Sequence, residues 1–106
     1  MTDLAIILTT CGSQETAQTI AEALVDKALA ASVTVIPRAK SYFAFHGTTR
    51  WDEEFQLLVY TTENRYEAVE QEIIRLHTYE VPEVFMLGVA RGAEDCLAWI
   101  RGMGRK

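Results

Sequence analysis

The 106-residue chain has no long hydrophobic run, no paired cysteine motif and no cluster of basic residues inside the sequence. Its longest apolar runs, at residues 4–8 and 84–90, are far shorter than the roughly 20 residues that a membrane-spanning helix needs. The first residues, Met1-Thr2-Asp3, lack the basic region and the small-residue cleavage site of a signal peptide. These absences predict a cytoplasmic protein that does not enter a membrane.

Positive charge is also scarce. The net charge is −5, from 15 acidic and 10 basic residues, and basic residues gather only in the short tail of Arg101, Arg105 and Lys106. Proteins that bind nucleic acids gain most of their affinity by neutralising phosphates. An acidic chain without a basic stripe is therefore not expected to bind nucleic acid.

The composition that is present, 49% hydrophobic and 24% charged, is that of an ordinary globular protein. A chain of this length can bury one hydrophobic core, so residues 1–106 are predicted to form a single domain. In a cytoplasmic protein, Cys11 and Cys96 are expected to be reduced thiols. The sequence contains no glycine-rich phosphate loop and no nucleophile beside a base, so we do not expect an enzyme.

Four segments have the composition of strands. The predicted strands cover residues 4–10, 32–45, 51–60 and 83–90. Pro37 cannot donate a hydrogen bond to a neighbouring strand, so the second strand is expected to bulge there or to run along an edge. Gly47 lies in a short polar connection that predicts a hairpin between the second and third strands.

Helical spacing of apolar residues separates these strands. The predicted helices cover residues 13–29, 64–76 and 94–100. Ser13 is placed to cap the first helix, and Asn64 with Glu67 is arranged as a capping box at the start of the second. The resulting order is β-α-β-β-α-β with an extra C-terminal helix. This order predicts an α+β, ferredoxin-like fold, in which an antiparallel sheet carries two helices on one face.

The hairpin between the second and third strands is long and rich in aromatic residues. Its aromatic residues are Tyr42, Phe43, Phe45, Trp51 and Phe55. One interpretation is that this end curls back over its own sheet. We favour a subunit contact instead, because two helices cover only one face of such a sheet and an exposed aromatic ribbon binds a partner.

The connection at residues 77–83 carries the most chemically versatile side chains. It holds an imidazole, His77, and two carboxylates, Glu80 and Glu83, around Pro82. Imidazole and carboxylate groups are ligands for copper, zinc and other divalent metals, so His77 and Glu83 are candidate metal ligands. The alternative is structural: His77 interacts with the end of the preceding helix, and Glu83 satisfies backbone donors or an arginine.

Cys11 is the better of the two thiols for chemistry, because it lies at a strand end just before the start of a helix. Thiol pKa values fall at such positions, which favours metal or redox chemistry. A buried cysteine also behaves as a small hydrophobic residue, so packing is the alternative for Cys11. Packing is the expected role of Cys96.

These residues resemble the CutA divalent-cation tolerance family. Its His-Pro-Tyr-x-x-Pro-Glu signature is matched by His77, Tyr79, Pro82 and Glu83, with Thr78 in place of the first proline. Further matches, in the same order, are Lys27-Ala28-Leu29-Ala30-Ala31, Val33-Thr34-Val35-Ile36-Pro37, Ser41-Tyr42-Phe43, Gly47, Glu53-Glu54 and the tryptophan-bearing helix at residues 94–100.

The resemblance implies a tight homotrimer built through the long hairpin and a role in tolerance of divalent metals, copper in particular. Some family members are described as binding copper through a strand-1 cysteine, the signature histidine and the final glutamate. Here His77 and Glu83 match. The position of the cysteine is taken by Thr9, and Cys11 lies two residues later on the same side of the strand. The expected metal ligands are therefore His77, Glu83 and Cys11.

The sequence thus predicts a non-enzymatic, CutA-like homotrimer that binds or responds to copper or another divalent cation. Two alternatives stay open. One is a trimeric signalling module, similar to the PII proteins, that holds a small molecule between its subunits. The other is a structural or adaptor trimer without a ligand.

Overall fold

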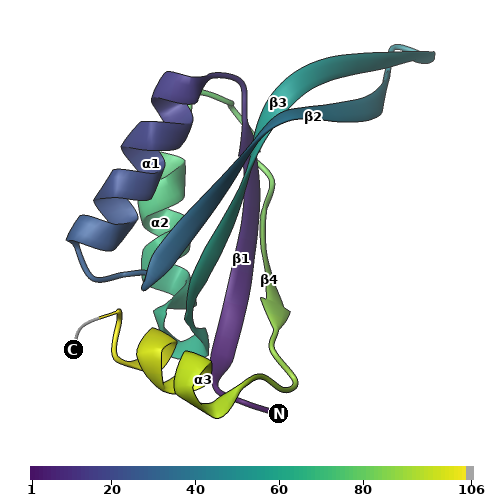
Figure 1. The fold of residues 1–106 in the computed structure, drawn as a ribbon. Coiled ribbons are helices and arrows are strands. Elements are labelled where there is room, and N and C mark those ends of the chain that lie inside the picture. The colour runs from purple at the N-terminus through teal and green to yellow at the C-terminus, as the bar shows by residue number, and fades with distance from the viewer. Residues whose placement is uncertain (105–106) are drawn as a thin grey trace.

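The computed structural model describes residues 1–104, so Arg105 and Lys106 of the basic tail lie outside the described residues. The elements follow the predicted order: β1 (Leu4–Cys11), α1 (Gln14–Asp26), β2 (Ser32–Phe45), β3 (Thr48–Thr62), a 3-10 helix (Glu63–Arg65), α2 (Tyr66–Leu76), β4 (Val84–Gly88) and α3 (Glu94–Arg101). The sheet order is β2-β3-β1-β4, and each neighbouring pair is antiparallel. Helices α1 and α2 lie side by side against one face of this sheet (Figure 1). The α+β, ferredoxin-like prediction is confirmed.

The hydrophobic core fills the space between the two helices and one face of the sheet. Alternate residues of β1 and β3 point into it, because successive side chains of a strand point to opposite faces. The sheet contributes Ile7, Leu57 and Val59, and the helices contribute Ile20, Leu24, Val69 and Ile73, all fully buried. This packing fixes the position of the C-terminal end of β1, where the candidate site lies.

Helix α1 begins as predicted and ends earlier than predicted. The Ser13 hydroxyl accepts the Thr16 N–H at 3.1 Å, which confirms the cap. The helix ends at Asp26, and Ala28 adopts a left-handed conformation with φ of 55°. Leu29 then donates its N–H to the Leu24 carbonyl at 2.9 Å and packs against the core. The apolar spacing continued past the helix because this closing turn also packs a partly buried leucine against the core.

The predicted capping box at the start of α2 is wrong. Residues Glu63–Arg65 form a 3-10 turn, and the α-helix begins only at Tyr66. The Asn64 side chain accepts a hydrogen bond from the Thr62 hydroxyl at 2.5 Å, so its oxygen is already engaged by a side chain before the helix starts. At the other end of the helix, strand β4 is also shorter than predicted and ends at Gly88.

The β2–β3 hairpin projects beyond the helices, away from the rest of the molecule (Figure 1). A bulge interrupts its pairing between Ile36 and Ala39, where Arg38 has a φ of 61°, so the break expected at Pro37 is confirmed. At the tip, His46 and Gly47 both have positive φ, as a two-residue hairpin turn requires. The exposed aromatic end does not curl back over its own sheet.

The second face of the sheet is not covered by α1 or α2. Residues opposite each other in antiparallel strands share a face. Leu8 pairs with Leu58 and Phe85, and Ile6 pairs with Tyr60 and Leu87. We call this set the open face: Ile6, Leu8, Leu58, Tyr60, Phe85 and Leu87. Helix α3 lies at the end of the sheet where β1 begins (Figure 1), and within residues 1–104 no helix has the length and apolarity to cross a membrane.

Candidate functional site

The segment after α2 is attached to β1 through the ring of His77. Its Nε2 lies 2.7 Å from the carbonyl oxygen of Thr10, and its Nδ1 accepts the Tyr79 N–H at 3.1 Å. A nitrogen that accepts a hydrogen bond carries no proton, so the proton of the neutral ring is on Nε2, which donates to the carbonyl. These two bonds fix both the orientation and the tautomer of the imidazole.

Tyr79 attaches the same segment to β3. Its hydroxyl donates to Oε2 of Glu54 at 2.5 Å. Burial of the phenol, and then the hydrogen bond to the Glu54 carboxylate, raise the pKa of Tyr79 well above its usual range, so the hydroxyl stays protonated. Gly12 leaves room for this arrangement, because a Cβ there would lie 3.1 Å from the Tyr79 hydroxyl oxygen.

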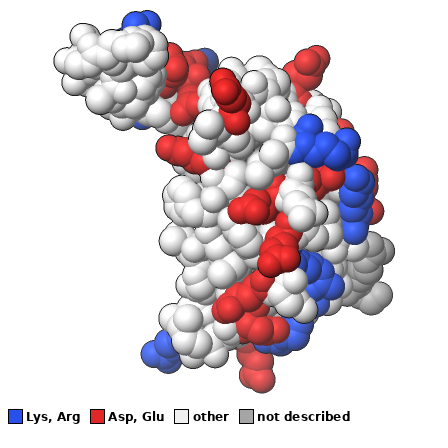
Figure 2. Space-filling view, turned by 180° about the vertical axis from the view of Figure 1, so that it is seen from behind, with Lys and Arg blue, Asp and Glu red and all other residues white. Residues whose placement is uncertain are grey.

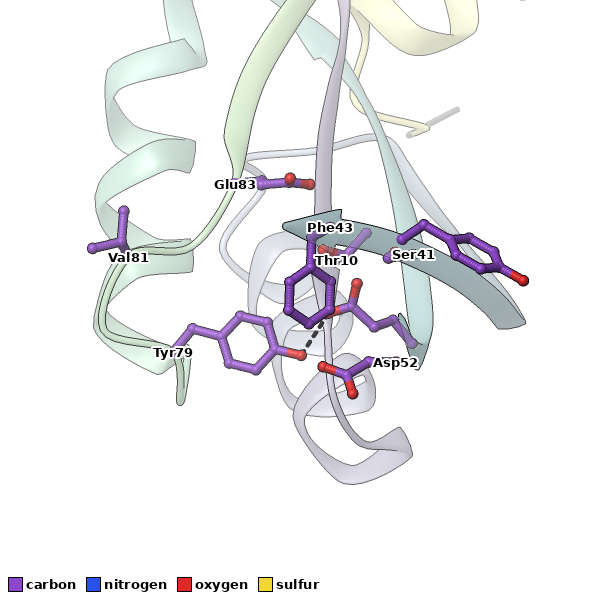
Figure 3. Close-up of a pocket in the computed structure, with 9 residues that line it drawn as sticks. Thr10, Ser41, Phe43, Asp52, Tyr79, Val81 and Glu83 are labelled. Atoms are coloured by element: carbon purple, nitrogen blue, oxygen red, sulfur yellow. Dashed lines mark hydrogen bonds between the residues drawn. The ribbon is translucent and has the colours of Figure 1, made fainter. Parts of the chain in front are cut away.

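These contacts border a cavity of about 380 Å³ at the base of the hairpin (Figure 3). Strands β1, β2 and β3 contribute Thr10, residues 41–43, Asp52 and Glu54, and the segment after α2 contributes Tyr79, Val81 and Glu83. The lining holds three carboxylates and no lysine or arginine. We call this feature the acidic cavity. In the view from behind, acidic side chains also surround the base of the projecting hairpin (Figure 2).

The three expected metal ligands are not brought together. Glu83 is exposed and lines the acidic cavity, whereas Cys11 is fully buried in the core. Within residues 1–104, no three side chains of the His, Cys, Asp and Glu types gather in an arrangement that holds a metal ion. The reason is the alternation of β1: Thr9 and Cys11 point to the helices, while Thr10 borders the cavity.

The environment of Cys11 is opposite to the one expected at a helix start. Burial raises the pKa of its thiol, and its Sγ lies 3.5 Å from the Ser13 carbonyl oxygen that it donates to. The thiol therefore stays protonated and packs with the core, which is the alternative considered for this residue. Both cysteines are free, and Cys96 is exposed, so the packing role expected for Cys96 is wrong.

Asp52 and Glu54 were not identified from the sequence as site residues. They sit two positions apart in β3 and therefore share a face of the strand. The sequence did contain a sign of this site. Three consecutive carboxylates, Asp52-Glu53-Glu54, come just before the largely apolar second half of β3. What the sequence did not show is that the segment at residues 77–83 lies against this part of β3.

Comparisons with known proteins find similar sequences and similar folds. The sequence profile of a family described as CutA1 divalent ion tolerance protein matches residues 5–103. The chain is similar to the divalent-cation tolerance protein CutA of Thermus thermophilus, with 38% identity over 91% of this chain and 93% of that protein. A solved structure of CutA from Xylella fastidiosa has a TM-score of 0.92 at 32% identity and covers 98% of this chain and 100% of that one.

One comparison overturns the expected location. A structure from Archaeoglobus fulgidus, 31% identical with a TM-score of 0.89 and covering 96% of this chain and 99% of that chain, is described as the periplasmic divalent cation tolerance protein CutA. The prediction of a cytoplasmic protein, made from the lack of a signal peptide and of a long apolar run, is therefore wrong. Its physical basis was weak, because a folded acidic domain has the same composition in either compartment.

Proposed function

The chain belongs to the CutA1 divalent ion tolerance family, and on that premise we propose that it forms a homotrimer that binds divalent cations, copper among them. In this proposal the protein contributes to tolerance of these ions by binding them, and no catalytic step is assigned to it.

The observation that carries the cation proposal is the state of the His77 ring. Metal-binding histidines commonly donate one ring N–H to a backbone carbonyl and use the other nitrogen as the ligand. The Nε2–H of His77 already donates to the Thr10 carbonyl, and Nδ1 is the unprotonated nitrogen. Among residues 1–104, the only hydrogen-bond partner of Nδ1 is the Tyr79 N–H in the same connection, so a metal ion can replace a single, local hydrogen bond.

Glu83 is the second proposed ligand, because its exposed carboxylate belongs to the same connection as His77. Cys11 is the third residue of the proposal and the one with the largest barrier. Its buried thiol would have to lose its proton and leave the core before it could bind a metal. Copper(II) binding through His77 and Glu83 alone is accordingly the first form to test.

Two separate apolar surfaces support the homotrimer. The open face exposes half of Leu87 and nearly half of Phe85, and the hairpin exposes Tyr42 and Trp51. A contact between two different surfaces of identical chains is heterologous, and it closes into a ring when the rotation between neighbours allows. Three subunits are the number that the resemblance to CutA implies. The hairpin of one subunit would then cover the open face of the next.

The test of the cation proposal is a calorimetric titration with copper(II) and zinc at neutral pH. We expect wild-type protein to bind copper(II), and His77→Ala to lose about tenfold or more in affinity, the loss typical of removing one ligand or its support. His46→Ala is the matched control, because His46 is the only other histidine and lies at the hairpin turn. Equal affinity in the wild type and the His77 variant would remove His77 from the site.

A further inference from the structure

We propose, resting on the function proposed above in which His77 is a metal ligand, that the contact between Tyr79 and Glu54 opposes metal binding at His77. A metal ion binds Nδ1 of His77 only when Tyr79 moves, and this movement pulls the Tyr79 side chain away from Glu54. Tyr79 is in this sense a positioning residue, which regulates the affinity of the site without touching the metal ion.

The space in front of the free nitrogen of His77 is already filled. The Tyr79 amide nitrogen lies 3.1 Å from Nδ1 and donates its N–H to it. A bond between zinc and an imidazole nitrogen is about 2.0–2.1 Å long, so a metal ion does not fit between these two nitrogens. When a metal ion binds, either the imidazole ring turns or Tyr79 moves.

The imidazole ring is the more firmly held of the two. Its Nε2 donates to the Thr10 carbonyl at 2.7 Å, and Thr10 belongs to β1 and is paired with Gln56 of β3. Metal-binding histidines commonly keep such a bond to a backbone carbonyl, because it orients the ring and makes the ligand nitrogen more basic. Tyr79 is therefore the residue that gives way.

The side chain of Tyr79 is anchored at the base of the β2–β3 hairpin. Its hydroxyl donates to Glu54 at 2.5 Å (Figure 3). Glu54 is paired with Ala39, the first pair after the bulge in β2, and is only 8% exposed. Moving Tyr79 would leave this buried carboxylate without its hydrogen-bond donor, which is costly. The contact with Glu54 therefore holds the Tyr79 N–H in place against a metal ion.

The opposition acts in both directions. If the contact lowers the affinity for the metal ion by some factor, the metal ion weakens the contact by the same factor, because coupling between two equilibria is reciprocal. Glu54 lies at the base of the hairpin that is proposed to cover the next subunit. A metal ion at His77 therefore loosens the base of this hairpin.

The test is a calorimetric titration of the full-length protein with copper(II) at neutral pH. Tyr79→Phe keeps the ring and removes the hydroxyl, so we expect its copper(II) affinity to rise by about fivefold or more, as for other coupled sites. A purely structural role of Tyr79 would give an equal or lower affinity. Tyr42→Phe is the matched control and should bind like the wild type, because within residues 1–104 the hydrogen-bonded tyrosine hydroxyls are those of Tyr66 and Tyr79.

A second pair of variants shows whether the effect acts through His77. In His77→Ala, the additional change Tyr79→Phe should not raise the copper(II) affinity. Hydrogen exchange of the wild type supplies a measurement that needs no variant: residues 52–55 should exchange faster with copper(II) than without it.

Equal or lower affinity in a folded Tyr79→Phe variant would overturn the proposal, and so would unchanged exchange of residues 52–55 in wild-type protein that binds copper(II). These results would leave the proposed function standing, because the wild type still binds the ion. Absence of copper(II) binding in both the wild type and Tyr79→Phe would overturn the proposed function and the coupling together.

Discussion

The hydroxyl of Tyr79 donates a 2.5 Å hydrogen bond to Glu54, a carboxylate that β3 buries beside the acidic cavity. The two residues are 25 positions apart in the chain. Together with the bond from His77 to the Thr10 carbonyl, this contact holds the segment after α2 against the end of β1 and the middle of β3. The residues of the family signature therefore also form one wall of the acidic cavity.

Replacing Tyr79 with Phe should destabilise the protein by about 1–3 kcal/mol, because Glu54 would stay buried without its hydrogen-bond donor. Denaturant unfolding followed by circular dichroism measures the change. Tyr42→Phe is the control, since the exposed Tyr42 hydroxyl makes no hydrogen bond within the described part of the chain. The contact contributes nothing to stability if the two variants unfold at the same denaturant concentration.

Thr9 offers a stabilising substitution. Its Oγ1 is buried and lacks a hydrogen-bond partner within residues 1–104. Thr9→Val keeps the shape and removes the unsatisfied polar atom, so we expect stability to rise by about 1 kcal/mol. Thr61→Val is the matched comparison, because the equally buried Thr61 hydroxyl donates to the Leu29 carbonyl at 2.7 Å. That variant should lose stability, and opposite signs of the two changes in unfolding free energy are the expected result.

Glu72 makes stability depend on pH in acid. Hydrogen bonds from Arg75 and then Lys27 lower the pKa of the Glu72 carboxyl from 4.5 to about 2. A lowered pKa in the folded state means that the contribution is complete above pH 4.5 and is lost as the pH falls toward about 2. The difference in unfolding free energy between wild type and Glu72→Gln should shrink across this window. A difference that stays constant from neutral pH to pH 2 would contradict this assignment.

Whether the open face is a subunit interface can be tested by introducing one charged residue there. Leu87 on this face is 50% exposed in the single chain, and Ile74 on α2 is 53% exposed. If the open face is a subunit interface, Leu87→Glu should dissociate the assembly, because burying an unpaired carboxylate is costly. Ile74→Glu should leave the assembly intact. Light scattering after gel filtration measures both masses, and equal masses for the two variants would exclude Leu87 from the interface.

Local patterns in the sequence predicted most of the fold. The short aliphatic run at residues 4–10, bounded by a turn, identified β1, and the helical spacing of apolar residues after Ser13 identified α1. The end of α1 was predicted too late, since a left-handed turn at Ala28, rather than the helix, packs the partly buried Leu29 against the core. The site was harder to predict. Cys11 follows the spacing of a possible ligand, but the pairing of β1 turns it toward the helices.

The burial of Glu54 likewise could not be predicted from the sequence. Nothing near it in the sequence indicates burial, because its partner Tyr79 comes from a distant segment. Contacts between elements are set by the packing of the whole sheet, whereas the sequence pattern reports only which side of an element is apolar. That His77 and Glu83 bind a metal ion stays a prediction.

Native mass spectrometry, with and without copper(II), tests the central claim most directly. The account predicts an assembly of about three times the 11.9 kDa chain, whose mass increases by bound copper in the wild type and not in His77→Ala. Single chains of 11.9 kDa, or trimers whose mass is unchanged by copper, would contradict it.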